Sequence, residues 1–169
     1  DHFWTALGLT FDGKPFRSLS QGEVDLSAIP LTDEAKAQEQ AAESLDVKGL
    51  VDALRKALED AVTDVRASKR LTESAVCLVA PRGGPDLGLG RLLQRQQPGG
   101  KSRPVLEINP NHPLIRAIGR RIAENGAAEA AEWAHLLLDE ARILDGEPPV
   151  DPAAFATRVN SLMLKALGN

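Results

Sequence analysis

Residues 104–125, PVLEINPNHPLIRAIGRRIAEN, hold the change of pattern that decides the fold class. Pro104–Asn109 is a short apolar run bounded by turn residues, which predicts a β-strand. From His112 onward, apolar residues recur every three or four positions, which predicts a helix over 112–125 that ends at Asn125-Gly126. The apolar face of this helix consists of Leu114, Ile115, Ile118 and Ile122. A strand followed by an amphipathic helix indicates a fold that combines both elements.

The segments on either side extend this combination. Residues 62–68 and 74–80 are short, contain several valines and are bounded by polar residues, which predicts two more strands. Before them, residues 47–58 carry leucine and valine at helical spacing. After residue 125, a second helix is predicted over 128–144, and Asp151-Pro152 predicts the N-cap and first turn of a third. We therefore expect an α+β fold with a small three-stranded sheet, flanking helices and a helical C-terminal end.

The composition excludes several classes of function. The chain has 169 residues, 43% of them hydrophobic, which suits one packed domain or one domain with a fragment of another. A formal charge of −4 and only 4% aromatic residues argue against binding of nucleic acid. No apolar run reaches the length of about 18 residues that a membrane-spanning helix needs. The first residue is Asp1 rather than methionine, so we expect an excised piece of a longer protein.

Motifs for phosphate and metal binding are incomplete. Residues 99–102, Gly-Gly-Lys-Ser, resemble the end of a phosphate-binding loop, but Arg95 stands where that loop needs glycine. His135 and Asp139 are four positions apart on an expected helix. Because two ligands are too few for a metal site, we interpret them as a surface His–Asp pair.

A catalytic alternative depends on three other residues. A small α+β enzyme would place its site near His112, Glu107 and Cys77. A single thiol in a strand is more often a small core residue than a nucleophile. We therefore expect Cys77 to be a core residue. We expect His112 to be a helix-start residue held by local turn chemistry, and Glu107 has no second carboxylate at a recognisable spacing.

Two segments carry apolar side chains outside these elements. Residues 86–96 predict a short amphipathic helix, in which two glycines each cost up to about 1 kcal/mol relative to alanine. Its apolar positions are Leu89, Leu92 and Leu93. Near the N-terminus, Phe3 and Trp4 share one face of a short helix, Asp12-Gly13 predicts a turn, and a polar helix follows over 33–44.

Five segments, in the same order, resemble the bacterial branch of the ninety-kilodalton heat-shock chaperone family. They are FDGKPFRSLSQG at 11–22, SKRLTESAVCLVA at 68–80, LEINPNHPLI at 106–115, EWAHLLLDEARILDGE at 132–147 and DPAAFATRVNSLMLKAL at 151–167. The resemblance covers nearly the whole chain, and LEINPNHPLI followed by the last segment is specific.

The resemblance implies how the chain is divided and what it lacks. Residues 1–31 resemble the end of the middle domain and a connector, and residues 32–169 resemble the C-terminal dimerisation domain. In the family, an N-terminal domain binds and hydrolyses ATP with magnesium. The resemblance therefore implies that this segment has no catalytic, cofactor or metal site of its own, and that the parent is a bacterial cytoplasmic ATPase.

The resemblance also implies two kinds of partner. The last two helices pack against the same pair in a second subunit as a four-helix bundle, which makes the protein a homodimer. The implied interface residues are Leu137, Ala141, Leu144, Phe155, Val159, Leu162, Met163, Ala166 and Leu167. Alternatively, these apolar side chains fill the core of one chain. We expect a mixed arrangement, in which one edge of each helix faces inward and another faces the partner.

The second implied partner is an unfolded or partly folded client protein. The implied client-binding residues are Phe3, Trp4, Leu89, Leu92 and Leu93. The alternative is that these leucines pack onto the body of the chain, which would leave a structural dimerisation module without a client role.

Overall fold

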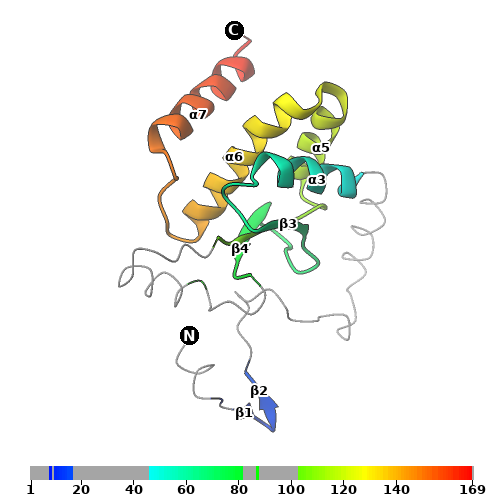
Figure 1. The fold of residues 1–169 in the computed structure, drawn as a ribbon, viewed down its shortest axis with the longest axis vertical. Coiled ribbons are helices and arrows are strands. Elements are labelled where there is room, and N and C mark those ends of the chain that lie inside the picture. Colours follow the sequence, from blue (N-terminus) through cyan, green and yellow to red (C-terminus); the bar gives the residue numbers. More distant parts are fainter. Residues whose placement is uncertain (1–7, 9, 17–45, 82–86, 88–102, 169) are drawn as a thin grey trace.

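The computed structural model describes residues 8, 10–16, 46–81, 87 and 103–168 (Figure 1). Near the N-terminus, strand β1 (Thr10–Phe11) pairs antiparallel with β2 (Lys14–Pro15). Asp12 and Gly13 connect them with φ angles of 52° and 70°. Two successive residues in the left-handed region are typical of a tight hairpin turn, and Asp-Gly is a preferred pair for it. The predicted turn is confirmed.

A three-stranded sheet forms one layer of the larger part of the structure, residues 46–81 and 103–168. Its strands are β3 (Asp64–Ala67), β4 (Val76–Val79) and β5 (Val105–Ile108), in the order β3-β5-β4. The central strand β5 runs parallel to β3 and antiparallel to β4. All four residues of β5 are buried, as expected for a central strand. The three predicted strands are confirmed, each shorter than its apolar run.

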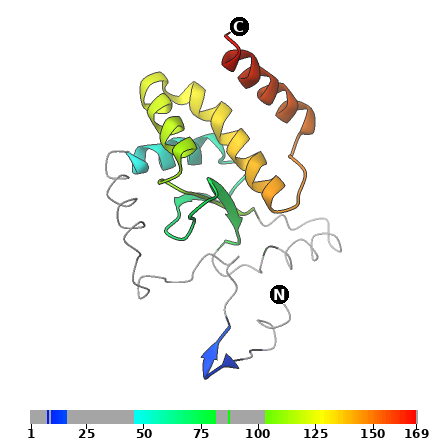
Figure 2. The same ribbon diagram turned by 180° about the vertical axis from the view of Figure 1, so that it is seen from behind.

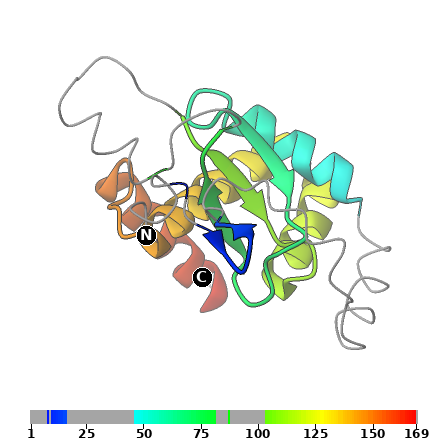
Figure 3. The same ribbon diagram turned by 90° about the horizontal axis from the view of Figure 1, so that it is seen from below.

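Three helices lie on one side of this sheet (Figures 1 and 3). They are α3 (Val47–Ala57), α5 (Pro113–Asn125) and α6 (Ala127–Leu144). Helices α3 and α6 are in direct contact with the strands, and α5 packs against these two helices. Their buried side chains and those of alternate strand residues form one core cluster. Its largest fully buried members include Leu54, Leu58, Leu106, Ile108, Ile115, Ile118 and Leu137. The predicted α+β class is confirmed.

Helix starts follow the predicted capping residues. The His112 Nδ1 accepts a hydrogen bond of 3.2 Å from the Leu114 backbone N–H, with proline in the first turn of α5. Asp151 Oδ1 accepts from the backbone N–H groups of Ala153 and Ala154, both at 3.0 Å. These bonds satisfy donors that a helix N-terminus leaves open. The helix-start roles predicted for His112 and Asp151 are confirmed.

The last helix, α7 (Pro152–Ala166), differs from the others. It follows a connecting segment after α6 and lies along the outside of the body (Figures 1 and 2). Every residue of α7 is described, and none of its side chains is buried. Within the described ranges, no helix is long and apolar enough to cross a membrane.

Candidate functional site on the last two helices

Two polar contacts show how α7 lies on α6. Lys165 Nζ is 3.3 Å from Glu132 Oε2, and Arg158 Nη1 is 3.5 Å from Asp139 Oδ2. Residues later in α7 thus face residues earlier in α6, so the two helices are antiparallel. Helix pairs of this kind are the units from which helical bundles are built.

Exposed apolar side chains gather at both ends of this pair. Ile143, Leu144 and Val150 are exposed where α6 ends. At the other end, the exposed apolar side chains are Met163, Leu164 and Leu167 of α7 and its C-cap. The two ion pairs place Met163 level with residue 134 of α6. The nearest members of the two groups are therefore about 15 Å apart along the pair. Leu167 is 77% exposed, the highest value among the large apolar side chains of the described residues.

The predicted interface residues divide into three sets. Leu137 and Ala141 are buried in the core of this chain, so in this conformation they are core residues and present no surface to a partner. Phe155, Val159 and Leu162 are half-buried. Leu144, Met163, Ala166 and Leu167 are exposed. The inward edge expected for each helix is seen in α6, whereas α7 buries none of its side chains. The edge that faces a partner, and the interface itself, stay predictions.

Helical periodicity missed part of the exposed apolar surface. Val150 lies in the connection between the helices, where no repeat applies, and Leu164 falls off the predicted stripe of α7. Ile143 directly precedes the predicted Leu144. The adjacent apolar residues Ile143 and Leu144 at the end of the helix could have predicted the exposure of Ile143.

The carboxylate of Asp139 lies under α7. The residue is only 3% exposed, pairs with Arg158, and accepts a long hydrogen bond of 3.4 Å from the Val150 backbone N–H. The interpretation of His135 and Asp139 as a surface pair is therefore wrong, because Asp139 faces the connection and α7. The available signal was an acidic residue directly after three consecutive leucines, 136–138.

The predicted client-binding residues lie outside the described part of the chain. They are Phe3, Trp4, Leu89, Leu92 and Leu93. The predicted helices over 33–44 and 86–96 and the proposed boundary after residue 31 lie there too, with Leu87 alone described in the second helix. These remain predictions.

Glu107 forms the centre of a separate polar cluster on the sheet. The strand register places Arg66 and Cys77 on either side of it. Arg66 Nη2 is 2.8 Å from Oε1, and Arg70 Nε is 2.9 Å from Oε2. Ser68 Oγ donates to Oε2 at 3.0 Å. Both carboxylate oxygens of a residue that is 3% exposed are therefore held by charged or polar donors.

This cluster has the chemistry of a structural ion network. Burial raises the pKa of the Cys77 thiol to about 11, so the thiol stays protonated at neutral pH and is a poor nucleophile. Burial alone would raise the pKa of Glu107, but hydrogen bonds and charge from Arg70 and Arg66 outweigh it and hold that pKa below its usual range. A carboxylate that stays ionised and is fully engaged is unsuited to proton transfer.

Cys77 lies on the face of the sheet that carries Glu107, opposite the core. Cys77 is half-buried, and its neighbours Val76 and Leu78 belong to the core cluster, so alternation puts the thiol on the opposite face of the sheet. The expectation that Cys77 fills the core is wrong. His112 caps α5, as described above. Of the alternative site near His112, Glu107 and Cys77, the geometry thus leaves Cys77 as an unactivated thiol and Glu107 as a carboxylate held in ion pairs.

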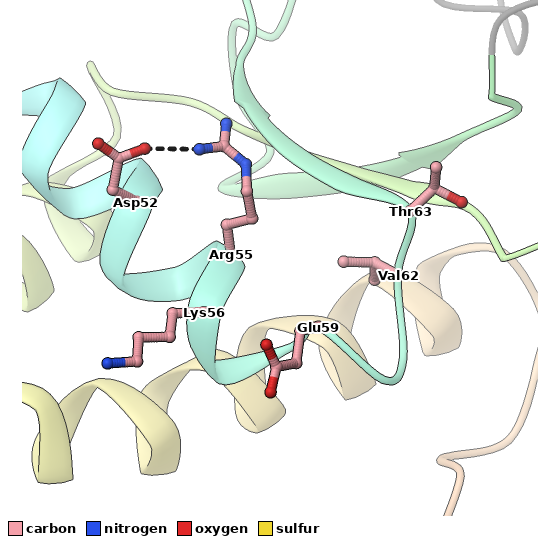
Figure 4. A pocket seen from close by; sticks show the side chains of 6 residues that line it. All are labelled: Asp52, Arg55, Lys56, Glu59, Val62 and Thr63. Carbon is pink, nitrogen blue, oxygen red and sulfur yellow. Dashed lines mark hydrogen bonds and ion pairs between the residues drawn. The ribbon is translucent and has the colours of Figure 1, made fainter.

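A surface hollow beside the end of α3 offers no clearer site (Figure 4). It is lined by Asp52, Arg55, Lys56, Glu59, Val62 and Thr63. The Arg55 guanidinium is 2.6 Å from Asp64 Oδ1 and 2.5 Å from Asp52 Oδ1, and hydrogen bonding to Asp64 raises its pKa. The charges that line the hollow balance, so it favours neither an anion nor a cation. Among the described residues, no group of three His, Cys, Asp or Glu side chains could hold a metal ion.

Comparison with known families identifies the class of protein. The family model described as Hsp90 protein matches residues 3–169. The chain therefore belongs to the Hsp90 family of chaperones, and the family resemblance inferred from its motifs is confirmed.

Within this family, similar relatives carry the name Chaperone protein HtpG. The chain is 53% identical to that of Rhodopseudomonas palustris strain BisA53 and 52% identical to that of strain BisB18, over 99% of this chain in both cases. It is 47% identical to that of Azorhizobium caulinodans, again over 99% of this chain. The chain spans about a quarter of the length of these relatives, 26% in each case.

Proposed function

We propose that this chain is the homodimerisation segment of an HtpG-type chaperone and that it joins two subunits through α6 and α7. Residues 1–31 would be the end of the middle domain and a connector, and residues 32–169 the dimerisation domain. The ATPase site, with its ATP and magnesium, would lie in an N-terminal domain outside this chain. The whole protein would act in the bacterial cytoplasm.

The exposure of α7 carries this proposal. A helix of 15 residues whose side chains are all exposed or only half-buried gains less from its own chain than a core helix does. Most helical stability in proteins comes from burial of an apolar face rather than from intrinsic propensity. The apolar residues of α7 therefore need a second surface, and a second copy of the α6–α7 pair offers one of matching character.

A charge introduced on this surface tests the dimer. In Met163→Glu, the new carboxylate is solvated in the monomer, because Met163 is 58% exposed. In the dimer it would be buried without a partner, which typically costs about 3–5 kcal/mol. We expect light scattering to give a folded monomer of 18.1 kDa, where the unchanged chain gives twice that mass.

A matched control separates this effect from a general effect of added charge. Leu114 is an exposed leucine at the start of α5, away from the proposed interface. Leu114→Glu adds the same group and should leave the dimer intact. The proposal is wrong if Met163→Glu and Leu114→Glu have the same dimer dissociation constant.

Client binding is the second part of the proposal, and it is supported by family membership and by the apolar residues of 1–7 and 86–96. Replacing Leu89, Leu92 and Leu93 by Ser should weaken suppression of the aggregation of a heat-denatured test protein, with the dimer mass unchanged. Unchanged suppression would instead favour a purely structural dimerisation module.

A further inference from the structure

Asp139 occupies a position where an apolar residue would be expected. It lies on α6 among the buried residues Leu137, Leu138 and Ala141, and it is itself 3% exposed. Burying a carboxylate costs several kcal/mol unless it is paired and hydrogen-bonded. Its presence in this stripe therefore needs a structural reason.

The partners of Asp139 supply that reason. The carboxylate contacts Arg158, in the middle of α7, and the backbone N–H of Val150, just before α7 begins. Both belong to the part of the chain that returns over α6. On the same side, Arg142 Nε donates to the Pro148 carbonyl at 2.8 Å. The connection and α7 are therefore attached to α6 by polar contacts in addition to the half-buried apolar ones.

The second ion pair between these helices is of a different kind. Lys165 and Glu132 lie near the surface, with 56% of the lysine side chain exposed. Exposed ion pairs contribute little, because water and salt screen the charges. Asp139–Arg158 is more enclosed, since only 5% and 27% of the two side chains are exposed. It is the polar contact able to select one orientation of α7.

We infer that Asp139 is a positioning residue that fixes α7 on α6 before a second copy binds. This inference rests on the proposed homodimer. A helix already held in its bound orientation loses less conformational freedom on association, which raises affinity without adding a contact to the partner. A buried ion pair adds little net stability, but it can select one geometry among several.

Sedimentation equilibrium on the full chain tests the inference. Asp139→Asn keeps the shape and an acceptor for Val150 but removes the charge, and Arg158→Gln removes the other partner. Each should raise the dimer dissociation constant about tenfold. Arg158→Lys keeps the charge and should restore most of the affinity. Lys165→Gln is the matched control on the same helix and should change the constant less than about twofold.

A second readout does not depend on the dimer. In the monomeric Met163→Glu background, Asp139→Asn should speed amide hydrogen exchange in α7 at least threefold and leave α3 unchanged. If neither Asp139→Asn nor Arg158→Gln changes the dissociation constant or this exchange, the inference is wrong. If the unchanged chain does not dimerise, the proposed function fails, and the exchange measurement still decides the role of Asp139. Should Asp139→Asn unfold the chain, Arg158→Gln decides alone.

Discussion

Helices α3 and α7 have similar N-caps, but their side chains are buried to different extents. Each begins after an aspartate N-cap, Asp46 or Asp151, whose carboxylate accepts from backbone N–H groups of the first turn. The shorter α3 buries Leu50, Val51 and Leu54 against the sheet and its neighbouring helices. The longer α7 buries none of its side chains. The difference shows that α3 completes the core of this chain, whereas α7 leaves apolar side chains such as Met163 and Leu167 exposed. The proposed homodimer would cover them.

The largest difference between the two helices should appear in stability. Leu54→Ala removes a fully buried side chain of α3 and should lower the free energy of unfolding by about 2–5 kcal/mol. Leu167→Ala, at the end of α7, should change it by less than about 0.5 kcal/mol in the monomer. Chemical denaturation in the Met163→Glu background measures both. Equal losses would contradict the distinction between a core helix and a surface helix.

A smaller effect is expected from the sheet that supports α3. Glu107→Gln leaves Arg66 and Arg70 without their carboxylate and should lower the free energy of unfolding at pH 7 by about 1–3 kcal/mol. Because the pKa of Glu107 is lowered by folding, its stabilisation is present above the unfolded pKa of about 4.3 and is lost as the pH falls through the folded pKa.

Urea denaturation between pH 7 and pH 3 checks this pH dependence. The unchanged chain and Glu107→Gln should differ most at neutral pH and converge in acid. A constant difference across this range would show that the charge of Glu107 does not contribute.

The smallest of these effects concerns the two N-caps. Asp46→Ala and Asp151→Ala each remove a capping carboxylate, which typically costs about 1 kcal/mol. For Asp46 the loss should appear in the global free energy of unfolding of the monomer. For Asp151 it should appear as faster hydrogen exchange confined to α7 and as a weaker dimer. A global loss from Asp151→Ala would mean that α7 is part of the cooperative core.

The sequence predicted local structure well and contacts between distant residues poorly. The strand and helix patterns around residues 47–58, 104–125 and 128–144 predicted elements that the structure contains, and the turn chemistry of His112 and Asp151 predicted two helix starts. These features depend on neighbours within a few positions.

The two buried carboxylates depend on residues far away in the chain. Arg66 and Arg70 reach Glu107 only through the parallel pairing of β3 with β5, and Arg158 reaches Asp139 only after the chain reverses between α6 and α7. Periodicity assigns a face to a residue, but it does not say whether that face meets the same chain or another one. Leu137 and Ala141, which the family resemblance places in the interface, are core residues in this chain.

Hydrogen exchange at several protein concentrations tests the central claim most directly, because it compares α3 and α7 in one sample. We expect the amides of α3 to be equally protected at all concentrations. Protection of α7 should rise as the concentration passes the dimer dissociation constant and fall again on dilution. Protection of α7 that does not change with concentration, in a chain that sediments at 18.1 kDa throughout, would contradict the assignment of this helix to a dimer interface.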